Sequence, residues 1–319
     1  MTSEQASMFE RKTGASGQVI QPDPTDPAYI VVASVSGGKD STAMCLWLKE
    51  QGIEHRRVCM DTGWEHESWY PYVEYIQGQL GPIDIIQGKD GGMTGLINRK
   101  KMFPSRRLRF CTTELKVIPF LDAMEKIRSE TGREPISCVG IRAAESKTRS
   151  DLPEWDYIPA NDDGFDGAFM WRPLINWTEK EVIDIHQKHN TRPNPLYLKG
   201  AERVGCWPCI FARKAEIRLL ADVDPDRVRL IERLEWAQTT EANARAEAKG
   251  KPKPAPRTWF HTHNKSGEPI DITNAVAWSR TSHGGKQHEM FANETEGCVR
   301  WGLCEGTGTP GWARKEATE

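Results

Sequence analysis

A strand that runs into two glycines and a helix start constrains the fold more than any other part of the chain. Residues 29–35 form a largely apolar run, which is typical of a buried parallel strand. Ser36-Gly37-Gly38-Lys39-Asp40-Ser41 follows, and residues 42–48 have the apolar spacing of a helix. Such glycines let backbone N–H groups approach an anion, and a helix N-terminus adds unpaired donors. With the charge of Lys39 and the hydroxyl of Ser41, the segment predicts a phosphate-binding loop for a nucleotide.

Strand-like and helix-like segments alternate through the first two thirds of the chain. Further strands are expected at residues 58–60, 83–86 and 136–140, with helices at 67–80 and 117–127. This alternation predicts an α/β fold, a Rossmann-like parallel sheet with helices on both faces. Ligands of such sheets bind beyond the carboxyl ends of the strands. The Ser36 loop, Asp61-Thr62-Gly63 and Gly140-Ile141-Arg142 are therefore expected to meet around one nucleotide.

The chain is expected to have three parts. Residues 1–28 are polar and rich in proline, and predict a flexible lead-in; residues 29–199 form the nucleotide-binding domain; residues 200–319 form a helical and irregular region with a small cysteine-containing cap. Thr178-Glu179-Lys180-Glu181 is a capping box that opens a helix. Asp224-Pro225 opens another, which stops at Gly250 before a stiff proline-rich linker. From Trp259 onward the sequence has little periodicity and is rich in Gly, Thr and Ser.

Composition narrows the function classes. The chain has 319 residues and a formal net charge of -2, so no global attraction to polyanions is implied. It has no apolar stretch of membrane-spanning length and no secretory signal near Met1, so a cytoplasmic location without a membrane partner is expected. Its eight cysteines are then better explained as metal ligands or core residues than as disulfides. Cys45, Cys59 and Cys138 fall inside expected helices or strands and are predicted to be core residues.

Two segments at expected strand ends carry candidate ligand-binding side chains. The carboxylate of Asp61, in Asp61-Thr62-Gly63, suits a ribose hydroxyl or a Mg²⁺ ion, although a helix-capping turn has the same pattern. After the next strand end, Gly140 allows close approach of a ligand, and Arg142 and Arg149 suit bidentate phosphate contacts. The alternative for these arginines is a solvated basic face.

The pair Cys206-Trp207-Pro208-Cys209 has the C-x₂-C spacing of metal sites and of redox dithiols. Zinc, an iron–sulfur cluster and a thioredoxin-type dithiol all remain open from the spacing alone. A dithiol of that type would follow a strand and begin a helix.

Taken as a whole, the string Ser36 to Ser41 resembles the PP-loop of the ATP pyrophosphatases; the spacing of a Walker A loop is absent. The resemblance implies that the β and γ phosphates of ATP bind at this loop and that ATP is cleaved between its α and β phosphates. Asp61-Thr62-Gly63 and the segment Gly140-x-Arg142-x₂-Glu145-Ser146 are similar to the phosphoadenosine phosphosulfate reductase and ATP sulfurylase branch, which includes DNA-sulfur-modification proteins. The resemblance spans roughly residues 29 to 215.

The cysteines extend this resemblance. The segment from Phe110 to Pro119 resembles the iron–sulfur segment of adenylylsulfate reductases, but Thr112 stands where that family has a second cysteine beside Cys111. Residues 196–209 are also similar to iron–sulfur members of the branch. The resemblance thus implies a [4Fe–4S] cluster on Cys111, Cys206 and Cys209, with Cys298 or Cys304 as the fourth ligand or one iron left open. The alternative is zinc held by Cys206, Cys209, Cys298 and Cys304.

The leading hypothesis is an enzyme that cleaves ATP, with Mg²⁺, to AMP and pyrophosphate and uses the cluster in sulfur transfer or nucleotide modification. Lys39, Asp40 and Arg142 are the expected catalytic residues, since Lys39 would neutralise charge on the leaving pyrophosphate. The first alternative is a phosphoadenylyl- or adenylyl-sulfate reductase that makes sulfite. Against it stand the intact loop and the absence of a terminal Glu-Cys-Gly. The second alternative is a non-catalytic nucleotide sensor with a structural zinc.

Possible partners follow from charged and aromatic side chains. The cations Arg99-Lys100-Lys101, Arg106-Arg107 and Arg109 predict either a solvated face or a landing site for a phosphorylated, sulfated or nucleic-acid substrate. A base could stack on one of four tryptophans, Trp64, Trp69, Trp207 and Trp301, although most tryptophans are core residues. A sulfur-donor or electron-donor protein is the other expected partner.

Overall fold

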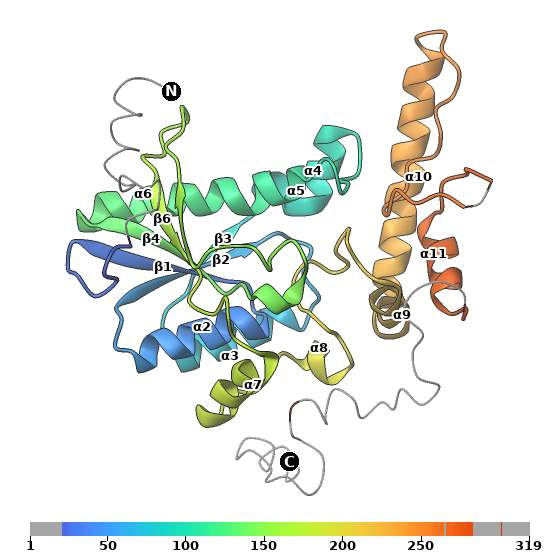
Figure 1. Ribbon diagram of the computed structural model, residues 1–319. Coiled ribbons are helices and arrows are strands. Elements are labelled where there is room, and N and C mark those ends of the chain that lie inside the picture. Colours follow the sequence, from blue (N-terminus) through green and yellow to red (C-terminus); the bar gives the residue numbers. More distant parts are fainter. Residues whose placement is uncertain (1–20, 265, 283–300, 302–319) are drawn as a thin grey trace, which may run out of the picture.

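A six-stranded sheet forms the centre of the molecule in the computed structural model, which describes residues 21–264, 266–282 and 301 (Figure 1). Its strands are β1 (Tyr29–Val35), β2 (His55–Asp61), β3 (Asp84–Gln87), β4 (Glu134–Val139), β5 (Trp155–Ile158) and β6 (Ala168–Trp171). The spatial order is β3-β2-β1-β4-β6-β5. All neighbours pair in parallel except β5, which runs antiparallel to β6. The predicted α/β class with a parallel sheet is confirmed.

Helices cover both faces of this sheet, because the central strand is apolar on both sides. Val31, Ala33 and Val35 of β1 pack in a core with α2 (Lys39–Glu50), α3 (Trp69–Leu80) and α7 (Glu179–Lys188). Ile30 and Val32 point the other way, into a core with α6 (Ile118–Thr131). Each fully buried valine or isoleucine contributes about 1.5–3 kcal/mol of transfer free energy, so β1 anchors both layers.

Three short helical turns and six further helices complete the described part of the chain. They are the 3₁₀ turns η1 (Lys89–Gly91) and η3 (Ala143–Glu145), the π-helical turn η2 (Thr113–Val117), and α4 (Gly92–Lys100), α5 (Phe110–Thr112), α8 (Pro195–Leu198), α9 (Lys214–Val223), α10 (Pro225–Glu247) and α11 (Ile272–Ser279). Helices α9, α10 and α11 lie to one side of the sheet (Figure 1). They share an apolar core with Trp64, Phe103 and Trp259.

Local signals in the sequence predicted β1 to β4 and the helices α2, α3, α6, α7 and α10, but not β5 and β6 or the other helices. The capping box is confirmed: Thr178 N–H donates to Glu181 Oε2 (2.7 Å), and Glu181 N–H donates to Thr178 Oγ1 (3.3 Å). Asp224 likewise caps α10, because its Oδ1 accepts from Arg227 N–H (3.0 Å). Helix α11 lies in the segment after Trp259, where the sequence has little periodicity. No helix in the described part of the chain has the length and hydropathy to cross a membrane.

A buried carboxylate fastens α10 to the segments that follow it. Glu235 Oε1 accepts from Trp259 N–H (2.8 Å), and its Oε2 accepts from Ile272 N–H (3.0 Å) at the start of α11. Burial raises the pKa of Glu235 from 4.5 to about 7, although both hydrogen bonds act in the opposite direction. Folding therefore favours the protonated acid.

The stability contributed by Glu235 should fall as pH rises from 4.5 to about 7, because its pKa is higher in the folded state than in the unfolded chain. The variant Glu235→Gln has the shape of the protonated acid and does not titrate. Its free energy of unfolding, relative to the parent, should therefore rise across this window by an amount on the order of 3 kcal/mol. Urea unfolding of both proteins at the two ends of the window measures this difference. A pH-independent difference would contradict the assignment.

Candidate functional site

The loop Ser36–Lys39 leaves the carboxyl end of β1 between the ends of β2 and β4, where the chain order of the sheet reverses. Gly37 has a φ of +71°, and a Cβ there would lie 2.6 Å from Nε1 of Trp69. That indole N–H donates to Ser36 O (2.9 Å). A side chain at position 37 would thus break the turn that aims the chain into α2.

Two backbone donors at the start of α2 are available to an anion. Ser36 N–H donates to Ser41 Oγ (3.1 Å), and this hydroxyl lies 3.1 Å from the Gly38 carbonyl oxygen. Among the described residues, no hydrogen-bond acceptor faces the amides of Asp40 and Ser41. Unpaired amides of a first helical turn carry partial positive charge and bind phosphate oxygens.

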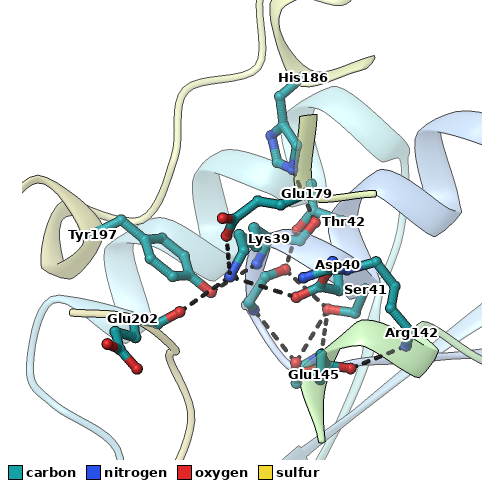
Figure 2. A network of polar contacts seen from close by, with 12 residues as sticks. Lys39, Asp40, Ser41, Thr42, Arg142, Glu145, Glu179, His186, Tyr197 and Glu202 are labelled. Carbon is teal, nitrogen blue, oxygen red and sulfur yellow. Dashed lines mark hydrogen bonds and ion pairs between the residues drawn. The ribbon is translucent and has the colours of Figure 1, made fainter. Parts of the chain in front are cut away.

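Lys39 is buried and surrounded by oxygen atoms of the protein (Figure 2). Its Nζ donates to Glu202 O (3.0 Å) and lies 3.4 Å from Glu179 Oε1 and 3.8 Å from Asp40 Oδ2. Its backbone N–H donates to the hydroxyl of Tyr197 (3.0 Å). A phosphate group at the loop would therefore have to replace contacts that α7, α8 and the following segment make with Lys39.

The segment after β4 touches the loop as expected. A Cβ on Gly140 would lie 2.8 Å from Asp40 O and 2.9 Å from Ser41 Cα, so only glycine fits against the first turn of α2. The buried Arg142 donates from Nε to Asp40 Oδ1. Arg149 is more exposed and pairs with Glu145, whose Oε2 also accepts from Arg142 N–H (3.0 Å). Arg142 thus lies at the loop, and Arg149 is linked to it through Glu145.

Asp61 and the two residues after it lie at the end of β2. Asp61 Oδ1 accepts from Gly63 N–H (2.8 Å) and from the Tyr70 hydroxyl (3.3 Å). The carboxylate of Glu65 accepts from Thr62 N–H (3.1 Å), Thr62 Oγ1 (2.7 Å) and Trp64 N–H (3.0 Å). Burial raises the pKa of Glu65. Sequence analysis missed Glu65, although Thr62-x-x-Glu65 has the spacing of a capping box.

Three cysteines pack against one apolar cluster close to this turn: Cys111, Cys206 and Cys209. Thr62 Oγ1 lies 3.8 Å from Cys206 Sγ, which joins the turn to the cysteines. The neighbouring Cys206 and Glu65 raise the pKa of Lys116, whereas burial raises the pKa of the Cys111 and Cys209 thiols. Within the described residues no three His, Cys, Asp or Glu side chains form a metal-binding group. Cys298 and Cys304 lie outside those residues.

The burial of side chains and the order of the elements test the predictions made for the other cysteines and for the tryptophans. Cys45, Cys59 and Cys138 are buried, as expected. Base stacking on the four tryptophans is wrong as a prediction, because all are at most 5% exposed: Trp64, Trp69, Trp207 and Trp301. A thioredoxin-type dithiol is wrong too, since Cys206–Cys209 follows helix α8 and ends before α9.

The buried residue His186, which was not predicted from the sequence, also lies at this site. Its Nε2 lies 2.9 Å from Lys39 O, and its Nδ1 lies 3.3 Å from Thr191 O. Burial lowers the pKa of His186. The ring therefore braces α7 against the first residue of α2.

Comparison with known proteins identifies the family of this chain. Residues 30–212, more than half of the sequence, match the phosphoadenosine phosphosulfate reductase domain. The chain belongs to this family. Members of the family are enzymes. We therefore conclude that this chain is an enzyme of sulfur metabolism with a nucleotide-binding fold.

Several known proteins are similar to this chain. An uncharacterized 37.8 kDa protein of Escherichia phage 186 is 28% identical over 333 aligned positions, which cover 86% of this chain and 97% of that protein. Adenosine 5'-phosphosulfate reductase of Mesorhizobium japonicum is 24% identical over 56% of this chain and 65% of its own length, just under two thirds. Among solved structures, phosphoadenylyl-sulfate reductase of Candida auris matches 66% of this chain and 97% of its own, with 14% identity and a TM-score of 0.42.

Replacement of Gly140 should disturb the loop without touching a ligand. The methyl group of Gly140→Ala would press on the backbone of Asp40 and Ser41, so we expect a loss of about 1–3 kcal/mol of stability and weaker binding of any nucleotide that this loop holds. Gly78→Ala is the control, because Gly78 lies in α3 and a Cβ there meets no atom within 4 Å. Urea unfolding and calorimetric titration with ATP give both quantities. Equal behaviour of the two variants would contradict the close contact.

Proposed function

We propose that this chain binds ATP with Mg²⁺ and cleaves it to AMP and pyrophosphate while activating an acceptor. The observation that carries the proposal is the intact loop Ser36–Ser41 at the reversal point of the sheet. Its first helical turn offers the amides of Asp40 and Ser41, and Lys39 and Arg142 lie beside them. Two cations and two helix-terminal donors suit a polyphosphate better than a single sulfate or phosphate group.

Each residue has a defined role in this proposal. The β and γ phosphates accept from the amides of Asp40 and Ser41, and Lys39 exchanges Glu179 for a phosphate oxygen. The acceptor attacks the α-phosphorus, the bond to the bridging oxygen breaks, and pyrophosphate leaves with the negative charge, so that AMP is attached to the acceptor. A second nucleophile, such as water or a sulfur donor, then breaks the bond between the acceptor and AMP, and AMP leaves. Arg142 donates only its Nε to Asp40, so the outer nitrogens of its guanidinium serve the α-phosphate. The Asp61 carboxylate holds Mg²⁺ or the ribose.

The variant Lys39→Ala tests the role of the loop. Removing the ammonium leaves charge on the departing pyrophosphate without its counterion, so pyrophosphate release should fall by about 100-fold or more. Lys49→Ala is the matched control, since Lys49 is an exposed lysine on the same helix. Enzymatic detection of pyrophosphate measures the rate, and the melting temperature reports whether the variant folds. Undiminished release by a folded Lys39→Ala protein would refute the proposal.

A reductase that converts adenylyl sulfate or its 3'-phosphate to sulfite is the second candidate. Its support is the family match and the relatives that carry this name. Incubation with each sulfonucleotide and a dithiol reductant, followed by sulfite analysis, separates the two candidates. Sulfite formation without ATP turnover favours the reductase. Binding of ATP without either product favours a nucleotide sensor.

We further propose that Cys111, Cys206 and Cys209 hold a [4Fe–4S] cluster, with Cys298 or Cys304 as a fourth ligand; zinc is the alternative. Its support is that three thiols from two segments pack against one apolar cluster. As they stand, the three side chains do not form a metal-binding group, so the bound cluster would have to draw them together. A cluster would supply redox or sulfur-binding chemistry beside Thr62.

Anaerobically purified protein should therefore be brown and contain iron and acid-labile sulfide. Cys206→Ser should lose most of both, because one of few thiolate ligands is removed. Cys45→Ala should keep them, since Cys45 is buried in the core of α2 and the sheet. Colourless protein with one zinc ion per chain would refute the iron–sulfur assignment.

A further inference from the structure

The six cations between residues 99 and 109 fall into two groups. Arg99 pairs with Asp90 and Glu114, Lys100 Nζ lies 2.6 Å from Glu114 Oε1, and Lys101 Nζ lies 2.9 Å from Glu241 Oε1. This first group is neutralised by its own protein. The idea that all six cations form one landing surface is therefore wrong.

The second group, Arg106, Arg107 and Arg109, is exposed and has no carboxylate within ion-pairing distance among the described residues. The loop that carries it is held in shape by Ser105. Ser105 N–H donates to Leu108 O (3.0 Å), and Leu108 N–H donates to Ser105 Oγ (3.0 Å). Three positive charges thus stand on a fixed loop, next to Leu108, whose side chain is 54% exposed.

Phe211 orients two of these guanidinium groups without cancelling their charge. The guanidinium of Arg106 lies 5.7 Å from the ring centroid of Phe211, and that of Arg109 lies 5.2 Å from it. A cation–π contact occupies the face of the guanidinium and leaves its N–H donors pointing outward in its plane. Arg109 uses one donor on Thr112 Oγ1 (3.4 Å), so most donors of the group remain available.

We propose that Arg106, Arg107, Arg109 and Phe211 form an arginine surface that binds the phosphodiester backbone of a single-stranded nucleic acid. Arginines spaced along an exposed loop match phosphates repeated along a strand, whereas a small anion requires donors that converge on one point. Leu108 and the ring of Phe211 add apolar contacts for bases. The chain carries a formal net charge of only -2, so this surface is a local excess of positive charge and not part of a basic protein.

The position of the surface connects it to the candidate site. Arg109 precedes Cys111 by two residues, and Phe211 follows Cys209 by two. A strand bound here would pass close to Cys111 and Cys209, which pack against the same apolar cluster as Cys206. This inference goes beyond ATP cleavage and does not depend on it, because binding of the strand requires no nucleotide.

Fluorescence anisotropy with labelled single-stranded RNA and DNA, without ATP, tests the arginine surface. The triple variant Arg106→Ser, Arg107→Ser, Arg109→Ser should bind at least about ten-fold more weakly. The slope of log K against log salt should become shallower by about 2, as expected for three lost phosphate contacts on a single strand. Phe211→Leu, which keeps an apolar side chain but removes the π face, should lose part of the affinity.

The control removes the same charge elsewhere: Lys249→Ser, Lys251→Ser and Lys253→Ser change three exposed lysines that have no carboxylate partner within the described residues. This control should keep full affinity, and Lys39→Ala should keep it even if ATP turnover is lost. Equal losses in both triple variants would overturn the proposal, because the effect would be one of net charge. The proposal would also be overturned if neither RNA nor DNA bound detectably. The same holds if inorganic polyphosphate, at the same phosphate concentration, displaced the labelled strand as well as unlabelled nucleic acid does.

Discussion

The contact between the α-carbon of Gly140 and the first turn of α2 determines the geometry of everything around it. Because β4 pairs directly with β1, the chain that leaves β4 meets the chain that leaves β1 at van der Waals distance. On the opposite side, a Cβ on Gly38 would lie 3.4 Å from the Tyr197 hydroxyl and from Val204 O. The loop is therefore held between these two segments, and the amides of Asp40 and Ser41, at the start of α2, have no acceptor among the described residues.

The balance of charges around the loop explains how Lys39 can be buried. Burial of an ammonium group without a counterion costs several kcal/mol, and Glu179, Asp40 and the Glu202 carbonyl offset that cost. Asp40 also pairs with Arg142, so two cations and two carboxylates alternate around the loop. An incoming polyphosphate can take the place of the Glu179 carboxylate without leaving a buried charge unpaired. In the proposed function, this network keeps Lys39 charged and positioned before a polyphosphate binds.

Sequence patterns predicted those features whose causes are local. The strand, the glycine turn and the helix at residues 29–50 each have a signature within a few residues, as does the Thr178 capping box. Contacts between residues far apart in the sequence have no such signature: Tyr197 contacts Lys39 over a separation of 158 positions, and His186 contacts it over 147. Helix α11 has only eight residues, too few for clear periodicity, and is fixed by Glu235 of α10. The pairing of Arg99 and Lys100 with Glu114 likewise depends on how η2 folds against α4.

The turn at Thr62 shows how one buried carboxylate joins the two halves of the candidate site. Three donors satisfy Glu65, and the positive charge of Lys116 lies close enough to lower the free energy of its ionised form. The same Lys116 interacts with Cys206, and Thr62 Oγ1 contacts the Cys206 sulfur. A change of charge at the cysteines must therefore alter the field at Glu65 and at the turn that carries Asp61. Because this turn ends the strand next to β1, the turn that Cys206 contacts and the loop Ser36–Lys39 lie at the same edge of the sheet.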